Sequence, residues 1–226
     1  MLSYDAPMPA AQGQKDTAAM TTLSGQAAAP TTAGGRAQTY QHHHIWLVTG
    51  PAGCGKSTVA EHLSQALSLP YIEGDSFHPP ANIEKMANGT PLTDADRWDW
   101  LTVLREESTR LISSGSEGVV LTCSALKRKY RDVIRVAAYY DPSLLIHFIY
   151  LDASEETLLQ RVAQRKGHYM GANMVHSQFD ILERPGEDEK DVIKVDVSRT
   201  LEEVKGDALH RVVKVMGDDE VEEEQQ

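Results

Sequence analysis

The stretch Gly50-Pro51-Ala52-Gly53-Cys54-Gly55-Lys56-Ser57 decides the fold that we expect of this chain. It follows a short apolar run at residues 45–49 and precedes a pattern with Val59, Leu63 and Leu67 on one helical face. Glycines at these positions allow backbone N–H groups to wrap phosphate oxygens, and the helix N-terminus adds partial positive charge. Because G-x-x-x-x-G-K-S stands between a strand and a helix, we interpret it as a phosphate-binding loop and not as a chance glycine-rich turn.

This loop predicts a site for ATP and Mg²⁺. Lys56 should reach the β- and γ-phosphates, and Ser57 should coordinate the metal. The residues that we expect to contact the nucleotide are Gly50, Pro51, Ala52, Gly53, Cys54, Gly55, Lys56, Ser57 and Thr58. The sequence contains no Asn-Lys-x-Asp guanine signature and is short for motor machinery. A small-molecule kinase is therefore favoured over a GTPase or a motor ATPase.

Apolar runs alternate with helical patterns along the rest of the chain, which is typical of an α/β fold with a parallel sheet between helices. We expect strands at residues 45–49, 70–72, 119–123, 144–151 and 192–197. We expect helices at residues 56–67, 96–114, 127–138, 154–166, 174–183 and 201–216. The near-continuous apolar character of residues 45–48 and 145–150 indicates strands that are covered on both faces.

The length of 226 residues allows one domain with flexible ends. Residues 1–40 consist mainly of Ala, Thr, Gly, Gln and Pro, and we expect them to be disordered, with no role that the sequence identifies. We place the kinase domain at residues 41–216. Six of the seven residues 218–224 are acidic, so residues 217–226 are expected to form a disordered acidic tail.

Charge and cysteine content limit the partners and the cellular compartment that we expect. A net charge of −11 argues against a nucleic-acid partner, which would require a basic face. Two separated cysteines make no disulfide framework, which favours a reducing compartment such as the cytoplasm. We expect no membrane association, because no apolar run reaches about 18 residues. A transit peptide is not favoured either, because Lys15 and Arg36 are the only cations of residues 1–40.

Two carboxylates, Glu73 and Asp75, follow the second expected strand. Side chains two residues apart on a strand share a face, and ligands bind at the carboxyl edge of a parallel sheet. One carboxylate could hold the water shell of magnesium while the other accepts a hydroxyl proton. The alternative is that both are solvated loop acids.

Several separate blocks of sequence resemble the gluconate kinase family. They are residues 74–79, Asn82 to Met86, Gly89 to Leu101 with Asp94, Asp96 and Arg97, Cys123 to Asp132, Arg161 to Tyr169, and residues 178–185. Together they span about residues 43–215. The resemblance implies the fold of nucleoside-monophosphate and shikimate kinases, in which a five-stranded parallel sheet is flanked by helices and carries a mobile lid. It also implies a homodimer.

The resemblance implies ATP-dependent phosphorylation of D-gluconate to 6-phosphogluconate, which feeds the pentose phosphate pathway. Asp75 is then similar to the residue that orients and deprotonates the attacking hydroxyl. Glu73 stands where relatives usually carry Asp, in the magnesium shell. Arg161 and Arg165, four residues apart on one helix face, resemble lid arginines that close over ATP. With Lys56 and Asp75 they make up the expected catalytic set.

A substrate carboxylate requires a cation, preferably a guanidinium, and Arg97, Lys127 and Arg131 are the candidates. The sequence does not rank these three. His78 could bind a substrate hydroxyl or only pack, and Gln178 is a further candidate for the substrate pocket. Two alternatives to a gluconate kinase stay open. One is a P-loop kinase for shikimate, adenylylsulfate or a nucleoside monophosphate, and the other is a regulator that binds nucleotide without catalysis. Whether other sugar acids are accepted is also open.

Overall fold

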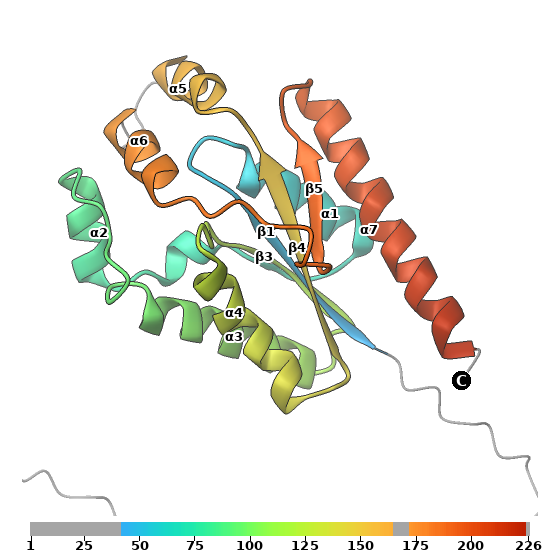
Figure 1. The fold of residues 1–226 in the computed structure, drawn as a ribbon. Helices are drawn as coiled ribbons and strands as arrows, with labels where there is room; N and C mark the ends of the chain where they lie inside the picture. Colours follow the sequence, from blue (N-terminus) through green and yellow to red (C-terminus); the bar gives the residue numbers. More distant parts are fainter. Residues whose placement is uncertain (1–41, 165–171, 225–226) are drawn as a thin grey trace, which may run out of the picture. The chain divides into compact units, whose positions relative to one another are not determined.

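A computed structural model describes residues 42–164 and 172–224. Its strands are β1 (His43–Thr49), β2 (Tyr71–Ile72), β3 (Gly118–Thr122), β4 (Leu144–Asp152) and β5 (Val192–Asp196). Its α-helices are α1 (Lys56–Leu67), α2 (Pro80–Ala87), α3 (Trp98–Ser113), α4 (Arg128–Tyr140), α5 (Glu155–Gln164), α6 (Ala172–Asp180) and α7 (Leu201–Glu224), and a 3₁₀ helix spans Gly74–Phe77. Figure 1 shows their arrangement.

The strands form one five-stranded sheet in the order β2-β3-β1-β4-β5, and every pair is parallel. The central strand is β1, in which Leu47 lies opposite Leu121 of β3 and Phe148 of β4. Helices cover both faces, with α3 and α4 on one side and α1 and α7 on the other (Figure 1). The predicted five-stranded parallel sheet flanked by helices is confirmed.

Alternate residues of β1 pack into the two halves of the core, one on each face of the sheet. Leu47 packs in a cluster with Leu104 of α3, whereas its neighbour Trp46 packs with Leu63 of α1 and Ala208 of α7. All five side chains are almost fully buried. Successive side chains of a strand point to opposite faces, so a strand that is buried on both faces must be apolar throughout. This explains the uninterrupted apolar run that predicted β1.

Helix α2 was not predicted. Pro80 occupies its first position, where the missing proline N–H removes no hydrogen bond, and Lys85 lies in its last turn. The helix is short and only Asn82 and Met86 are buried, so its apolar periodicity is too weak to detect in the sequence. The start of α3 also differs. Asp96 accepts hydrogen bonds from the backbone N–H and hydroxyl of Thr93, and the helix itself begins two residues after Asp96, at Trp98.

The prediction of a disordered acidic tail is wrong for residues 217–224. Helix α7 was expected to end at residue 216, but it continues to Glu224. Gly217 alone does not terminate it, since glutamate is a good helix former and no proline follows. The expected disorder of residues 1–40 and the site role of Arg165 lie outside the described residues, and the lid stays a prediction. Among the helices described, none combines the length and apolar character needed to cross a bilayer.

A buried ion pair fixes α4 to the segment between α6 and β5. The guanidinium of Arg131 donates to both carboxylate oxygens of Glu189, at 2.7 and 2.6 Å, and each side chain is only 2% exposed. The same guanidinium donates to the carbonyl oxygens of Ala125 and Glu183, both at 3.2 Å. The hydrogen bonds from Arg131, together with those from Arg135, lower the pKa of Glu189 to about 2, although burial opposes this. Both charges are therefore compensated inside the protein.

We predict that Arg131→Met lowers the free energy of unfolding by about 3–5 kcal/mol, because Glu189 is left as a buried charge that has lost its bidentate partner. Urea unfolding followed by circular dichroism measures this. Arg128→Met is the matched control, since Arg128 pairs with Asp188 on the exposed side of the same helix. The control should change stability far less.

The pH dependence of stability is a second test of the pair Arg131–Glu189. Because the pKa of Glu189 is lower in the folded protein than the ordinary value, its contribution to stability is present at neutral pH. That contribution should be lost as the pH falls from about 4 towards about 2. Equal effects of Arg131→Met and Arg128→Met on stability would contradict the prediction.

Candidate active site

The phosphate loop connects β1 to α1 and turns through left-handed backbone conformations. Gly53 and Gly55 have φ angles of 85° and 101°, which favour glycine because a Cβ would be strained there. Gly55 is also the N-cap of α1, so the free N–H groups of the first turn point into the loop. Lys56 donates to the carbonyl oxygen of Pro51 at 3.1 Å. These features together form a concave site for an anion.

Glu73 lies at the carboxyl end of β2, beside the end of β3. One carboxylate oxygen accepts from the Thr122 hydroxyl and the other from the Tyr71 hydroxyl, both at 2.5 Å. Burial would raise the pKa of Glu73, but hydrogen bonds from Thr122, Tyr71 and Ser57 outweigh it and lower the pKa below its ordinary value. Glu73 is therefore an ionised oxygen ligand held close to the Ser57 hydroxyl. Hard oxygen ligands of this kind suit Mg²⁺, so these two residues fit the metal expected here.

A small cavity joins the loop to the residues that follow β2. Its polar lining consists of Lys56, Asp75, His78, Arg97, Ser124 and Gln178. Met86, Leu92 and Met174 form a separate apolar cluster along the same cavity. The enclosed volume of about 30 Å³ is smaller than a six-carbon molecule.

Asp75 has the electrostatic properties of a base. Desolvation in the cleft raises the pKa of its carboxyl, the neighbouring charge of Lys56 lowers it, and that of Glu73 raises it, with a net increase above the ordinary value. About half of the side-chain surface stays exposed, so a ligand can reach the carboxylate. A carboxylate with a raised pKa holds a proton more strongly than an ordinary aspartate, which favours proton acceptance from a bound hydroxyl.

The structure ranks the three candidate cations. Arg97 is 6% exposed and lines the cavity, and within the described part of the chain its Nε has no hydrogen-bond partner. Lys127 is held by Asp94 at 3.0 Å. Arg131 does not line this cavity and donates both of its paired hydrogen bonds to Glu189, so its role as a substrate ligand stays a prediction that this cavity does not support. Arg97 is therefore the cation best placed to bind an anionic group in this cavity.

Gln178 binds the phosphate loop directly. Its side-chain oxygen, on α6, accepts the backbone N–H of Ala52 at 2.6 Å, and the contact is buried. The two residues are 126 positions apart in the sequence. Gln178 lines the small cavity, and its side-chain oxygen supports the loop; a contact with substrate stays a prediction.

A second cavity, of about 240 Å³, lies on the other side of the loop. It is lined by Gly53, Cys54, Gly55, Thr58, Arg161, Val197, Arg199, Leu201 and Val204. Arg161 donates to the carbonyl oxygen of Val197 at 2.6 Å, which places its planar guanidinium against the wall of this cavity. Apolar walls and two guanidinium groups beside a phosphate loop suit a flat base with an attached sugar. Arg165 lies outside the described residues.

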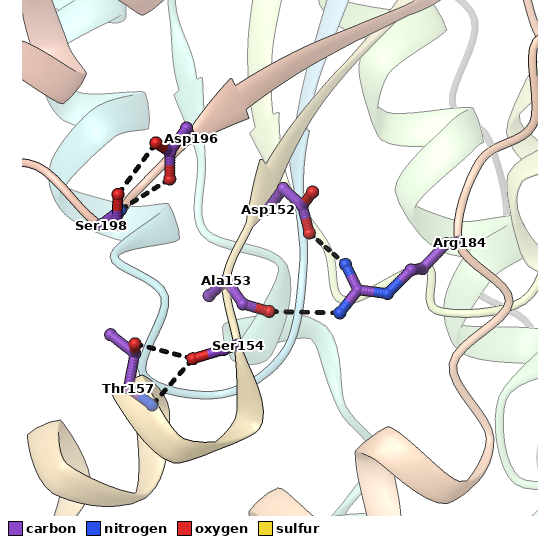
Figure 2. A pocket seen from close by; sticks show the side chains of 7 residues that line it. All are labelled: Asp152, Ala153, Ser154, Thr157, Arg184, Asp196 and Ser198. Carbon is purple, nitrogen blue, oxygen red and sulfur yellow. Dashed lines mark hydrogen bonds and ion pairs between the residues drawn. The ribbon is translucent and has the colours of Figure 1, made fainter.

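A third hollow, of about 330 Å³, lies beyond the ends of β4 and β5 (Figure 2). Arg184 bridges the carboxylate of Asp152 and the carbonyl oxygen of Ala153, and Ser198 binds Asp196. The remaining polar lining, Ser154 and Thr157, forms the start of α5. Because these groups bind one another, the hollow presents little unsatisfied polarity to a ligand.

Four residues of the site were missed by sequence reasoning. Thr122 and Ser124 follow from a rule that was available, since the carboxyl ends of parallel strands meet at one edge and both lie where β3 ends. Tyr71 could have been suspected from its position two residues before Glu73. Asn82 belongs to one of the blocks that resemble gluconate kinases, but the sequence assigned it no role, and the helix that carries it was not predicted.

Comparisons with known proteins find gluconokinases among both the sequence relatives and the solved structures. The sequence pattern of a family described as an AAA domain matches residues 45–184. A probable gluconokinase of Schizosaccharomyces pombe is 48% identical over 178 residues, covering 78% of this chain and 92% of that protein. The thermoresistant gluconokinase of Escherichia coli is 38% identical, covering 78% and 97%. The crystal structure of a gluconokinase from Sinorhizobium meliloti has a TM-score of 0.69 and 39% identity, covering 81% and 98%.

We predict that Gln178→Leu lowers the free energy of unfolding by about 1–3 kcal/mol, because the N–H of Ala52 stays buried without an acceptor. His176→Leu is the matched control on the same helix, since His176 is exposed and should tolerate the change. Urea unfolding of both variants tests the difference. Equal stability of the two variants would show that the hydrogen bond from Ala52 to Gln178 does not stabilise the fold.

Proposed function

We propose that this chain, because it belongs to the gluconokinase family of P-loop kinases, transfers the γ-phosphoryl group of ATP to a hydroxyl of D-gluconate to form 6-phosphogluconate. P-loop kinases generally use ATP with Mg²⁺. The identities of 48% and 38% to curated gluconokinases, over most of both chains, support this choice over other small-molecule kinases. The homodimer, the cytoplasmic location and the place of the product in the pentose phosphate pathway stay predictions.

One observation carries the proposal for the substrate. Lys56 of the phosphate loop, the carboxylate of Asp75 and the buried guanidinium of Arg97 line the same cavity. A phosphoryl donor on the loop, a hydroxyl beside Asp75 and a carboxylate beside Arg97 would therefore meet in one space. A sugar acid carries both the hydroxyl and the carboxylate that this arrangement requires.

The residues around the loop suggest how the transfer would proceed. Asp75 would take the hydroxyl proton while the hydroxyl oxygen forms a bond to the γ-phosphorus. The bond between that phosphorus and the bridging oxygen to the β-phosphate breaks, and ADP leaves. Lys56 would hold the oxygens of the migrating group and offset their negative charge. Arg161 would face the nucleotide from the second cavity, against which its guanidinium already lies.

Glu73 and Ser57 would hold the metal. Bound Mg²⁺ supplies positive charge that offsets the charge of the β- and γ-phosphates. The hydroxyls of Tyr71 and Thr122 donate to the two carboxylate oxygens of Glu73 and hold its side chain in place. The carboxylate therefore stays oriented towards the first turn of α1.

We predict that Asp75→Asn lowers gluconate-dependent turnover by about 10²- to 10⁴-fold, because the variant keeps the shape but loses the proton acceptor. ATP affinity should change little, since the phosphate loop is intact. Gluconate-dependent ADP release and calorimetric ATP binding measure the two effects. Asp99→Asn, an exposed position in the first turn of α3, is the control for the same chemical change.

The pH profile gives a further check. Because the pKa of Asp75 is raised, wild-type turnover should fall as the pH drops through a value above that of an ordinary aspartate. If turnover of Asp75→Asn fell by less than about threefold, Asp75 would not be the base. A collapse of ATP binding would instead assign it to the magnesium shell.

We also predict that Arg97→Met raises the KM for gluconate by about 10- to 100-fold, because a charge-assisted hydrogen bond to the substrate carboxylate is lost. Lys127→Met is the matched control, since Lys127 already pairs with Asp94. Steady-state kinetics with gluconate and with an uncharged polyol compare the two variants. A larger effect of Lys127→Met would reverse the ranking of the cations.

A further inference from the structure

Asn82 and His78 form a buried pair behind the small cavity. Asn82 is 3% exposed and His78 is 7% exposed. The Nδ2 atom of Asn82 lies 2.7 Å from the carbonyl oxygen of Asp96 and 3.5 Å from Nδ1 of His78. A buried amide that faces both an acceptor and an imidazole nitrogen has few ways to satisfy its hydrogen bonds. These contacts therefore indicate which nitrogen of the His78 ring carries the proton.

The carbonyl oxygen of Asp96 fixes the orientation of the Asn82 amide. A carbonyl oxygen only accepts, so the atom that faces it must be the NH₂ group of Asn82. The same NH₂ group has a second hydrogen, and it faces Nδ1 of His78. Because the amide nitrogen cannot accept, this contact is favourable only when Nδ1 is the unprotonated nitrogen of the ring. The proton of neutral His78 is therefore on Nε2.

The remaining contacts aim that N–H into the cavity. The His78 ring stacks on Trp100, with ring centroids 4.0 Å apart and planes 20° apart. Trp100 is itself fixed, because its indole N–H donates to the carbonyl oxygen of Gly74 at 2.8 Å. Nε2 lies 3.9 Å from a carboxylate oxygen of Asp75. This distance is too long for a direct hydrogen bond, so the pair leaves room between them.

The charges facing His78 also favour the neutral ring. Burial lowers the pKa of His78 to about 4, and the charge of Arg97 contributes. Asp75 is the facing carboxylate, and Lys56 lines the same cavity. On α2, the nearest group is the uncharged amide of Asn82. At neutral pH the ring therefore donates from Nε2 as an uncharged group.

We propose that His78 donates its Nε2 hydrogen to the hydroxyl that accepts the phosphoryl group, and that Asn82 is the positioning residue that sets this tautomer. The proposal rests on the proposed function, since it concerns the acceptor of the same reaction. An oxygen placed about 2.8–3.0 Å from both Nε2 and the carboxylate of Asp75 fits between two atoms 3.9 Å apart. That hydroxyl donates its hydrogen to Asp75 and accepts one from His78, which leaves its other lone pair for the γ-phosphorus.

The tautomer is tested on the free protein, without any substrate. Two-dimensional ¹⁵N NMR of the imidazole nitrogens should show His78 with a protonated Nε2 and an unprotonated Nδ1 at neutral pH. The His78→Gln variant identifies the resonance by its disappearance. A protonated Nδ1, or a doubly protonated ring at neutral pH, would overturn the proposal.

Substitutions at His78 test the contact with the hydroxyl. His78→Phe keeps a ring to stack on Trp100 but has no N–H, and kcat/KM for gluconate should fall about tenfold or more. His78→Gln retains an N–H donor at a similar reach and should recover most of that loss. Equal kinetics of wild type and His78→Phe would overturn the role of His78 while leaving the proposed function intact. If wild type released no gluconate-dependent ADP, the proposed function would fail, and so would this proposal for its acceptor.

Asn82→Asp tests the positioning role through pH. The carboxylate accepts from Nδ1, so it raises the pKa of His78 and makes Nδ1–H the neutral form. The variant should lose kcat/KM as the pH rises through that raised pKa, because Nε2 then has no hydrogen to donate. Wild type should show no such loss there. Asn88→Asp, exposed at the end of α2, is the control, and thermal unfolding checks the fold. An unchanged pH profile in folded Asn82→Asp would overturn the role of Asn82.

Discussion

The position of β1 between β3 and β4 is the constraint on which the rest of the structure depends. Hydrogen bonding on both sides fixes the strand in the middle of the sheet, and burial on both faces requires it to be apolar. The phosphate loop that follows Thr49 must therefore emerge at the centre of the carboxyl edge. The end of β1 is also held to the segment just beyond β3, because the hydroxyl of Thr49 donates to the carbonyl oxygen of Ser124 at 2.6 Å. The phosphate loop and the acids Glu73 and Asp75 converge because β1 and β2 end at the same edge of the sheet, with only β3 between them.

Charged residues in this chain divide into those that build the fold and those left available for chemistry. Arg131 and Glu189 satisfy each other in the interior and hold α4 against the segment before β5. Arg97 is also buried, and its Nε has no hydrogen-bond partner among residues 42–164 and 172–224. Burial of a guanidinium does not identify its role. The number of its protein partners does, because an unsatisfied buried donor is costly unless a ligand completes it.

The parts of the fold and site that depend on local sequence could be predicted. The phosphate loop, the bounds of α1 and the acids after β2 all follow from patterns within a few residues. The ranking of the cations could not be predicted, because it depends on contacts such as Arg131 with Glu189, 58 positions away. The bond from Gln178 to Ala52 spans 126 positions and has no local signature. Helix α2 was missed for a different reason, since eight residues with two buried side chains carry too little periodicity.

The methionines along the small cavity have a consequence for selectivity. Met86 and Met174 meet Leu92 in a buried apolar cluster that is separate from the main core. Unbranched thioether side chains adapt to the outline of whatever they contact. Such a wall distinguishes poorly between ligands by shape. Discrimination among acids of different length or stereochemistry would then come from the polar lining of the cavity, where a wrong ligand leaves hydrogen-bonding groups unpaired.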